Sequence, residues 1–339
     1  DLHLAQGREP RGGCGVTRRQ FRQTLAALSL ATPAFAAPAS AVRVSGPAVA
    51  ETLPLLAMGR LGPLPGIART VVFTPWNSPD QLRAMIATDD VDAALMTTAS
   101  ACTLANKGVP ATVVALTSSP VWLVSTDAAL ARLSGLDGRE VLLPFGPGEM
   151  PDLLLRALTG QAGLAFVPRH AGNALEAVNL LLLGQGHCAL LSEPAASLAV
   201  SRASARSRPG APVLGKRLDL RDAWREVFPD HPQLAQGALA VVGPLARDAA
   251  ACKTLQAAYV RAAGWMAAHP REGTTLVGKD FPALASQAVD GVLPGQDIRL
   301  VMGPQGARDA RFFLGLLHGM SPASIGGRLP GSAFFEVGA

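Results

Sequence analysis

Six short turns of the sequence concentrate residue types that bind small molecules through hydrogen bonds. They lie at positions 45–47, 74–78, 97–100, 117–119, 145–151 and 192–194. Their hydroxyls, side-chain amides and backbone N–H groups are the kinds of polar group that orient a bound ligand. Any one such turn is more often a helix cap with no ligand. Six of them, in two groups along the chain, favour a binding site.

The candidate ligand contacts lie in these turns or beside them. They are Ser45, Trp76, Asn77, Thr97, Thr98, Ser100, Trp122, Gly146, Gly148, Glu149, Asn173 and Glu193. The two tryptophans could stack on a planar or cationic group. The turns contain two glutamates but neither lysine nor arginine. We therefore expect a neutral or cationic ligand, which could be aromatic, rather than a simple oxyanion.

Each of the larger candidates also has a structural interpretation. Trp76 could be a partly buried packing residue, and Trp122 could be the buried aromatic of a strand. Glu149 and Glu193 each precede a predicted helix, where a carboxylate is favoured by the helix dipole. The sequence alone leaves these alternatives open.

Catalytic and metal-binding motifs are not found in the sequence. It contains no Gly-x-Ser-x-Gly, His-Glu-x-x-His or Cys-x-x-Cys motif and no complete phosphate loop of the form Gly-x-x-x-x-Gly-Lys-Ser/Thr. The turn at 146–148 lacks the companion glycine of a dinucleotide site. The histidines have no metal-ligand spacing, and His187 lies in an apolar strand. Cys102, Cys188 and Cys252 are widely spaced in apolar surroundings, so a single disulfide is possible but cannot be assigned. We expect no enzymatic activity, no cofactor and no metal.

Strand-like and helix-like segments alternate along the body of the chain. Strands are predicted at 41–45, 69–73, 91–96, 113–116, 121–124, 139–145, 165–169, 187–191, 213–220 and 238–242. Helices are predicted at 49–58, 79–87, 101–106, 152–158, 174–183, 244–268, 281–289 and 308–317. Strand, polar turn and helix in succession indicate βαβ units and mostly parallel sheets. Ligands bind such sheets outside the carboxyl ends of the strands, where the polar turns fall.

The N-terminal region has the pattern of an export signal. Thr17-Arg18-Arg19-Gln20-Phe21 precedes a charge-free stretch at 23–42, and Ala34-Phe35-Ala36 provides a small-x-small cleavage pattern. This resembles a twin-arginine signal, so residues 1–36 are interpreted as a signal region and the mature chain as periplasmic. The alternative is an amphipathic helix with an incidental arginine pair.

Composition limits the remaining classes of function. The chain of 339 residues is 49% hydrophobic, which excludes disorder, and carries a formal net charge of +5. Five arginines and two acidic residues lie in the first 36 positions, so little excess charge remains for a nucleic-acid surface. The uncharged stretch at 108–126 is divided by Pro110 and Pro120 and is predicted as two strands, not a membrane helix.

A family resemblance follows from the order of several segments. Phe73-Thr74-Pro75-Trp76, Val91-Asp92-Ala93-Ala94-Leu95, Trp122-Leu123-Val124-Ser125, Leu183-Gly184-Gln185-Gly186 and Ser192-Glu193-Pro194 occur in an order that resembles ABC-importer solute-binding proteins. The type is the one that binds nitrate, sulfonates, taurine or thiamine-pyrimidine precursors. The resemblance covers about residues 42–266, and no single motif within it is specific.

The resemblance implies a two-lobe periplasmic-binding-protein-like α/β fold of type II, with a ligand cleft between the lobes. One lobe would contain residues 41–119 and 236–339, the other 120–235, with hinge crossings near 120–125 and 233–239. It further implies a monomer that closes on a small molecule and delivers it to a membrane permease, without nucleic acid as a partner. A ligand-sensing module and a small biosynthetic enzyme on the same fold remain the alternatives.

Overall fold

The structure, a computed structural model, describes residues 39–206, 213–285, 297–301 and 303–335. The chain divides into residues 1–37 and a second unit, 38–339, to which all the described helices and strands belong. The predicted signal region at 1–36 therefore lies outside the described residues, as do residues 286–289 of the helix predicted at 281–289.

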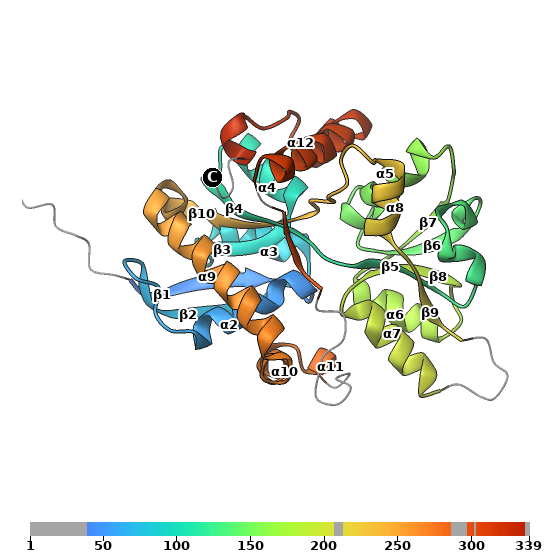
Figure 1. Cartoon of the computed structure of the whole chain (residues 1–339), viewed down its shortest axis with the longest axis horizontal. Helices are drawn as coiled ribbons and strands as arrows, with labels where there is room; N and C mark the ends of the chain where they lie inside the picture. The colour runs from blue at the N-terminus through green and yellow to red at the C-terminus, as the bar shows by residue number, and fades with distance from the viewer. Residues whose placement is uncertain (1–38, 207–212, 286–296, 302, 336–339) are drawn as a thin grey trace, which may run out of the picture. The chain divides into compact units, whose positions relative to one another are not determined.

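Two separate β-sheets form the framework of the second unit (Figure 1). Sheet A has the strand order β11-β4-β10-β3-β1-β2 and sheet B the order β7-β6-β8-β5-β9. Sheet A contains β1 (Ala39–Gly46), β2 (Ala68–Pro75), β3 (Ala93–Thr97), β4 (Ala111–Ser118), β10 (Gly237–Val242) and β11 (Arg299–Val301). Sheet B contains β5 (Val121–Ser125), β6 (Glu140–Pro144), β7 (Val167–Ala171), β8 (Cys188–Ser192) and β9 (Gly215–Asp219).

Strand directions explain how the chain connects the sheets. Strands β1 to β4 run the same way in sheet A, and β6 to β9 the same way in sheet B. The chain crosses from β4 to β5 and returns after β9 to β10. Both arriving strands are antiparallel to their neighbours. This pattern arises if the carboxyl ends of the two sheets face each other, since a crossing strand then enters the next sheet at its carboxyl edge.

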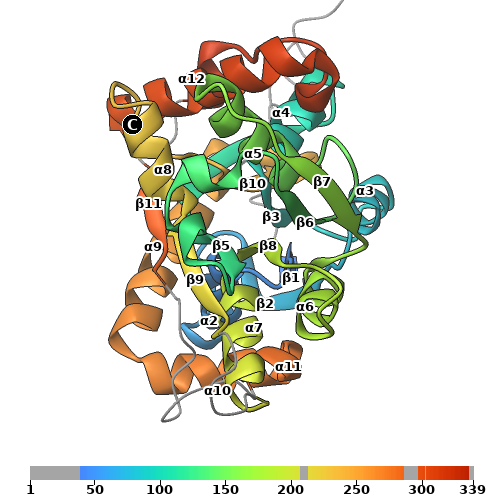
Figure 2. The same cartoon turned by 90° about the vertical axis from the view of Figure 1, so that its right-hand side faces the viewer.

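Helices cover both faces of each sheet (Figures 1 and 2). We call sheet A and its helices half A, and sheet B and its helices half B. Half A includes η1 (Ala50–Thr52), α2 (Leu53–Arg60), α3 (Pro79–Ala87), α4 (Thr98–Asn106), η4 (Gly243–Arg247), α9 (Ala249–Ala268), α10 (Pro270–Asp280), α11 (Pro282–Ala285), α12 (Gly303–Met320), η5 (Pro322–Ile325) and η6 (Ser332–Phe335). Half B includes η2 (Ala128–Ala131), η3 (Leu133–Leu136), α5 (Met150–Gln161), α6 (Ala174–Leu182), α7 (Ala195–Ser204) and α8 (Leu220–Val227).

Alternating side chains supply the core on the two faces of each sheet. In β3, Ala93 and Leu95 pack with α2 and α9, while Ala94 and Met96 pack toward α4 and α12. Sheet B follows the same rule, with Leu142 of β6 packing toward α6 and α7 and its neighbours toward α5 and α8. Helix α12 contacts both α4 and α5, so it joins the two halves on one side.

Most of the predicted elements are present, with three instructive differences. The helix predicted at 244–268 is interrupted at Asp248, whose carboxylate accepts hydrogen bonds from the N–H groups of Ala250 and Ala251 and so starts α9 afresh. That helix ends before Pro270 as expected, but α10 begins at this proline, which is tolerated in a first helical turn. Strand β11 was not predicted, because three residues show no periodicity.

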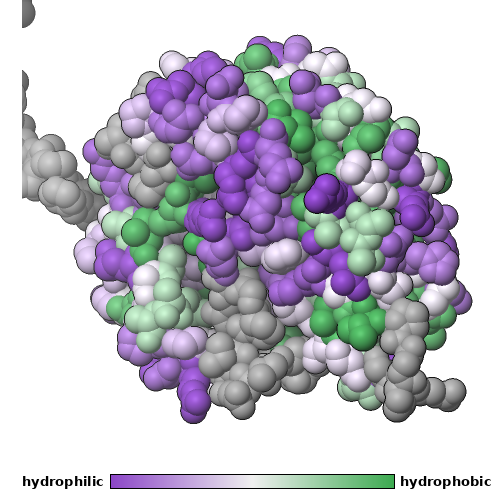
Figure 3. Space-filling model, turned by 45° about the vertical axis from the view of Figure 1, so that its right-hand side comes forward, coloured by the Kyte–Doolittle hydropathy of each residue, from purple (hydrophilic) through white to green (hydrophobic). Residues whose placement is uncertain are grey.

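The segment at 108–126 forms strands β4 and β5, which confirms the prediction of two strands. Within the part of the chain that the structure describes, the helices are too short or too polar for a membrane span. Cys102, Cys188 and Cys252 are buried free thiols. On the face seen in Figure 3, hydrophilic residues cover much of the surface and hydrophobic ones form several separate groups.

Candidate functional site

A pocket of about 220 Å³, here called the cleft pocket, is lined by residues from both halves. Half A contributes the turns after β1 and β2, and half B contributes residues at the carboxyl ends of β6, β7 and β8. Its lining is Pro47, Ala48, Val49, Trp76, Asn77, Val121, Pro144, Phe145, Pro151, Asn173, Ala174, Leu175, Leu190, Ser192 and Ala195. The pocket thus lies where ligands bind α/β sheets.

The described residues that line the cleft pocket carry no charged side chain. Trp76 is held in place because its indole N–H donates to the carbonyl oxygen of Leu95, at 3.2 Å. Polar groups come from Asn77, Asn173 and Ser192. Asn173 uses its Oδ1 atom to cap α6, which leaves its NH₂ group as a donor. An apolar wall with a few amide and hydroxyl groups suits an uncharged, partly apolar molecule.

Phe145 is a pocket residue that sequence reasoning named only as the start of a turn. Its backbone is in the left-handed region, with φ of 67°, which costs a non-glycine residue about 1–3 kcal/mol. The Nδ1 atom of His170 lies 3.0 Å from the Phe145 carbonyl oxygen and holds this conformation. Backbone strain of this kind is common at ligand sites. The only sign of it in the sequence was that Phe145 stands between Pro144 and Gly146.

A second pocket of about 300 Å³, the side pocket, adjoins the first. Trp76, Phe145 and Pro151 line both pockets. The side pocket lies among α3, α4, the turn before α5 and the turn of η5. Four further candidates from the sequence line it, namely Thr97, Ser100, Gly148 and Glu149. Thr97 and Ser100 are hydrogen-bonded to one another, at 2.8 Å between their hydroxyl oxygens.

The structure therefore brings seven of the twelve candidates to one or other pocket, and their contact with a ligand stays a prediction. Three of the rest lie elsewhere. Ser45 is fully buried and donates its hydroxyl to the carbonyl oxygen of Thr74, at 2.6 Å. Thr98 is equally buried and donates to the carbonyl oxygen of Ala235. Gly146 lies outside both linings.

Glu193 and Trp122 both lie beside the Lys216 ammonium, a cation that the sequence analysis did not identify. The Glu193 carboxylate is fully buried, pairs with the Lys216 ammonium at 2.9 Å and accepts the N–H of Ser197 in the first turn of α7. The same ammonium lies 5.1 Å from the centre of the Trp122 ring. Glu193 thus lies as a carboxylate at the start of a helix, which is its structural interpretation, whereas Trp122 is only half-buried. Contact of either residue with a ligand stays a prediction. Lys216 has no local signal, because β9 and β5 become neighbours only in the folded sheet.

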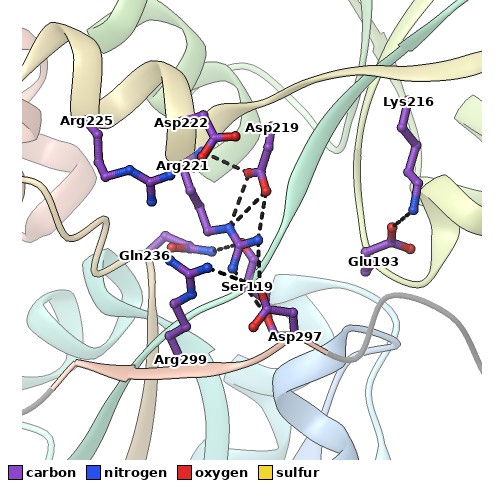
Figure 4. A network of polar contacts seen from close by, with 10 residues as sticks. All are labelled: Ser119, Glu193, Lys216, Asp219, Arg221, Asp222, Arg225, Gln236, Asp297 and Arg299. Carbon is purple, nitrogen blue, oxygen red and sulfur yellow. Dashed lines mark hydrogen bonds and ion pairs between the residues drawn. The ribbon is translucent and has the colours of Figure 1, made fainter.

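A polar network joins the halves where the chain crosses between them (Figure 4). Arg221 at the start of α8 pairs with Asp219 at 2.8 Å and, across the halves, with Asp297 before β11 at 3.0 Å. The side chain of Gln236, in the second crossing, donates to the carbonyl oxygen of Ser119 in the first, at 2.9 Å. These contacts tie the two connections to each other.

Glu51 in η1 is a buried carboxyl group beside this network, only 4% exposed. Its Oε2 atom has no hydrogen-bond partner among the described residues. Burial raises the pKa of Glu51, and a hydrogen bond with Ser119 and the charge of Arg221 oppose that shift without cancelling it. The folded protein therefore binds the Glu51 proton more tightly than the unfolded chain does.

We expect Glu51→Gln to stabilise the protein as pH rises. Because folding raises the pKa of this carboxyl group, its contribution to the stability of the wild type is greatest below the unfolded-state pKa of about 4.3. That contribution is lost as the pH rises toward the folded-state pKa. Glutamine cannot titrate, so the free energy of unfolding of the variant, measured with urea, should rise relative to that of the wild type as the pH increases above about 4. Exposed Glu226 provides the control substitution to glutamine. A stability difference that does not change with pH would contradict the expectation.

Metal-binding clusters do not accompany these pockets in the described part of the chain. Over residues 39–206, 213–285, 297–301 and 303–335, no three His, Cys, Asp or Glu side chains gather closely enough to hold a metal ion. The Glu193 and Asp219 carboxylates are instead paired with cations within the fold, and Glu149 lies singly at the side pocket.

No protein-family model and no curated protein matches this chain. Solved structures do resemble it. An ABC transporter protein of Parabacteroides distasonis has a TM-score of 0.69 and 20% identity, over 87% of this chain and 98% of that one. The periplasmic aliphatic sulphonate-binding protein SsuA of Escherichia coli has a TM-score of 0.60 and 14% identity, over 87% and 96%. The periplasmic nitrate-binding protein NrtA of Synechocystis PCC 6803 has a TM-score of 0.59 and 13% identity, over 85% and 84%.

At these identities the likeness shows the fold. The chain has the two-lobe α/β fold of periplasmic binding proteins, with four strands of each sheet running in one direction and a cleft between the sheets. The predicted fold class is confirmed.

Proposed function

We propose that this protein is the solute-binding component of an ABC importer that captures a small organic molecule. The observation that supports the proposal most is the cleft pocket, lined from both halves at the carboxyl ends of their strands. The fold is also that of periplasmic sulphonate-binding and nitrate-binding proteins. The twin-arginine-type pattern in residues 1–36 adds an export route to the periplasm.

In this proposal two lobes, residues 41–119 with 236–339 and residues 120–235, close on the ligand. A molecule that touches Trp76 and Asn77 of one half and Phe145 and Asn173 of the other favours the closed arrangement by its extra contacts there. The closed monomer then presents a surface to a membrane permease. No bond in the ligand is made or broken.

The ligand is proposed to be neutral or cationic, with a flat part that could be aromatic. The cleft pocket offers the Trp76 and Phe145 rings and apolar side chains such as Leu175, which is 42% exposed. A sulfonate or nitrate needs concentrated hydrogen-bond donors or a cation. The described lining residues of the cleft pocket provide neither Lys nor Arg.

A thermal-shift screen of the protein with pyrimidines, amines and sulfonates tests this proposal. A ligand that binds only the folded state stabilises it by about 2.7 kcal/mol at a hundred times its dissociation constant. For a chain of this size we expect a rise of about 5 °C in Tm with a pyrimidine or an amine, and none with a sulfonate. Tight sulfonate binding would refute the proposed ligand character.

Experiments with a ligand found in this screen distinguish transport from the two alternative functions, a biosynthetic enzyme and a ligand-sensing module. Recovery of the ligand unchanged after long incubation excludes the biosynthetic enzyme, which would convert it. Stimulation of ATP hydrolysis by a reconstituted permease, only with ligand present, supports transport. Binding without such stimulation, together with an effect on a sensor kinase, would favour the sensing module.

A further inference from the structure

The side pocket differs from the cleft pocket in carrying charge. Among its described lining residues are Arg83 and Lys107 of half A and Glu149 of half B. The two pockets meet at Trp76, Phe145 and Pro151. One ligand can therefore reach both, with a different part in each.

Glu149 is free of the structural duty expected at its position. It is the residue before α5, yet its carboxylate makes no capping hydrogen bond. The turn is instead closed by Asp152, which accepts the N–H of Gly148 at 2.9 Å and pairs with Arg156 at 2.7 Å. Among the described residues, the Glu149 carboxylate has neither a hydrogen-bond partner nor an ion-pair partner. Glu149 is thus available to a ligand.

The surroundings of Glu149 leave its charge poorly compensated. Burial raises the pKa of Glu149, the charge of Arg83 opposes that shift, and the charge of Asp80 adds to it. The Arg83 guanidinium is already engaged by Asp80 on its own helix, with Nη2 at 2.6 Å and Nε at 3.2 Å. Lys107 is exposed to water, where a charge interacts only weakly. A half-buried carboxylate in this setting gains most from a cation.

We infer that the side pocket holds a positively charged nitrogen group of the ligand against Glu149, while a flat uncharged part of the same ligand lies in the cleft pocket beside Trp76. This rests on the proposed function and narrows its ligand to an organic cation, such as an amine attached to a ring. The Trp76 side chain, which is 6% exposed, borders both pockets.

Three ring compounds of similar size test the inference on the full-length protein. Benzylamine carries a cation, benzyl alcohol is its uncharged counterpart, and phenylacetate is an anion. A charge-assisted hydrogen bond to Glu149 should make benzylamine bind about tenfold more tightly than benzyl alcohol, measured by calorimetry. In Glu149→Gln the two affinities should differ by less than about twofold.

Two controls separate a direct contact from a general charge effect. Glu226→Gln removes a carboxylate from the same half, outside both pockets, and should keep the tenfold preference. In the wild type, benzylamine should bind more weakly in acid, as Glu149 becomes protonated, while benzyl alcohol should not. The pH profile needs no variant, so it holds even if Glu149→Gln fails to fold.

The inference is overturned if the wild type binds benzyl alcohol or phenylacetate as well as benzylamine, or if the preference survives in Glu149→Gln. It is also overturned if none of the three compounds binds, because neither pocket would then bind the chemical group proposed for it. The thermal-shift screen with pyrimidines, amines and sulfonates decides separately whether the protein captures any small molecule.

Discussion

Replacing Arg221 by methionine should destabilise the protein by about 3–5 kcal/mol, measured by urea unfolding at neutral pH. Arg221 and Asp219 are both almost entirely buried, with 9% and 5% of their side chains exposed. Methionine fills a similar volume but leaves the Asp219 carboxylate in the interior without its cation. The variant also loses the ion pair with Asp297, which joins the two halves.

Arg225 on the same helix provides a matched control. It also pairs with an aspartate, Asp222, but 43% and 56% of the two side chains are exposed. Arg225→Met makes the same change in charge and should cost at most about 1 kcal/mol. If the two variants lost equal free energies of unfolding, burial of the Arg221 ion pair would not be the reason for its contribution to stability.

Replacing Trp224 by alanine should cost about 3–5 kcal/mol, for a different reason. Trp224 is fully buried, and its ring centre lies 4.4 Å from that of Phe228 and 5.6 Å from that of Phe313 in α12. Its indole N–H donates to the carbonyl oxygen of His231 at 2.7 Å. Alanine leaves a cavity between α8 and α12 and a carbonyl group without its donor.

Trp265 in α9 is the comparison for this substitution. It is only partly buried and stacks on His269, with 4.9 Å between ring centres. Trp265→Ala should cost about 1 kcal/mol, close to an average substitution. Thermal unfolding of both variants checks that Trp224→Ala is the more destabilising of the two. A Trp224→Ala protein as stable as the wild type would show that the contacts of Trp224 with Phe228 and Phe313 do not hold α12 in place.

Features decided by neighbouring residues could be predicted from the sequence. Ser78 and Asn173 cap α3 and α6 through their side chains, as the pattern of a polar residue before an apolar helix indicates. The polar turns that follow the strands were also recognisable, since hydroxyl, amide and glycine residues interrupt apolar runs. The general rule for parallel sheets then indicated where the cleft pocket would lie.

Features decided by distant residues could not be predicted in this way. Glu193 precedes a helix in the sequence, but only the folded sheet brings Lys216 to it and so commits its charge. Asp309 in α12 is fully buried, and its carboxylate accepts the N–H of Gln233, which lies 76 residues earlier in the second crossing.

The position of β10 between β3 and β4 has a consequence for synthesis on the ribosome. Residues 121–219 contain all the strands of sheet B, so that sheet can be completed while the C-terminal third is still being made. Sheet A cannot, because the gap between β3 and β4 is filled only when residues 237–242 emerge. Until then the nascent chain carries two open strand edges that invite pairing with other chains. The half that begins first is therefore the half that is finished last.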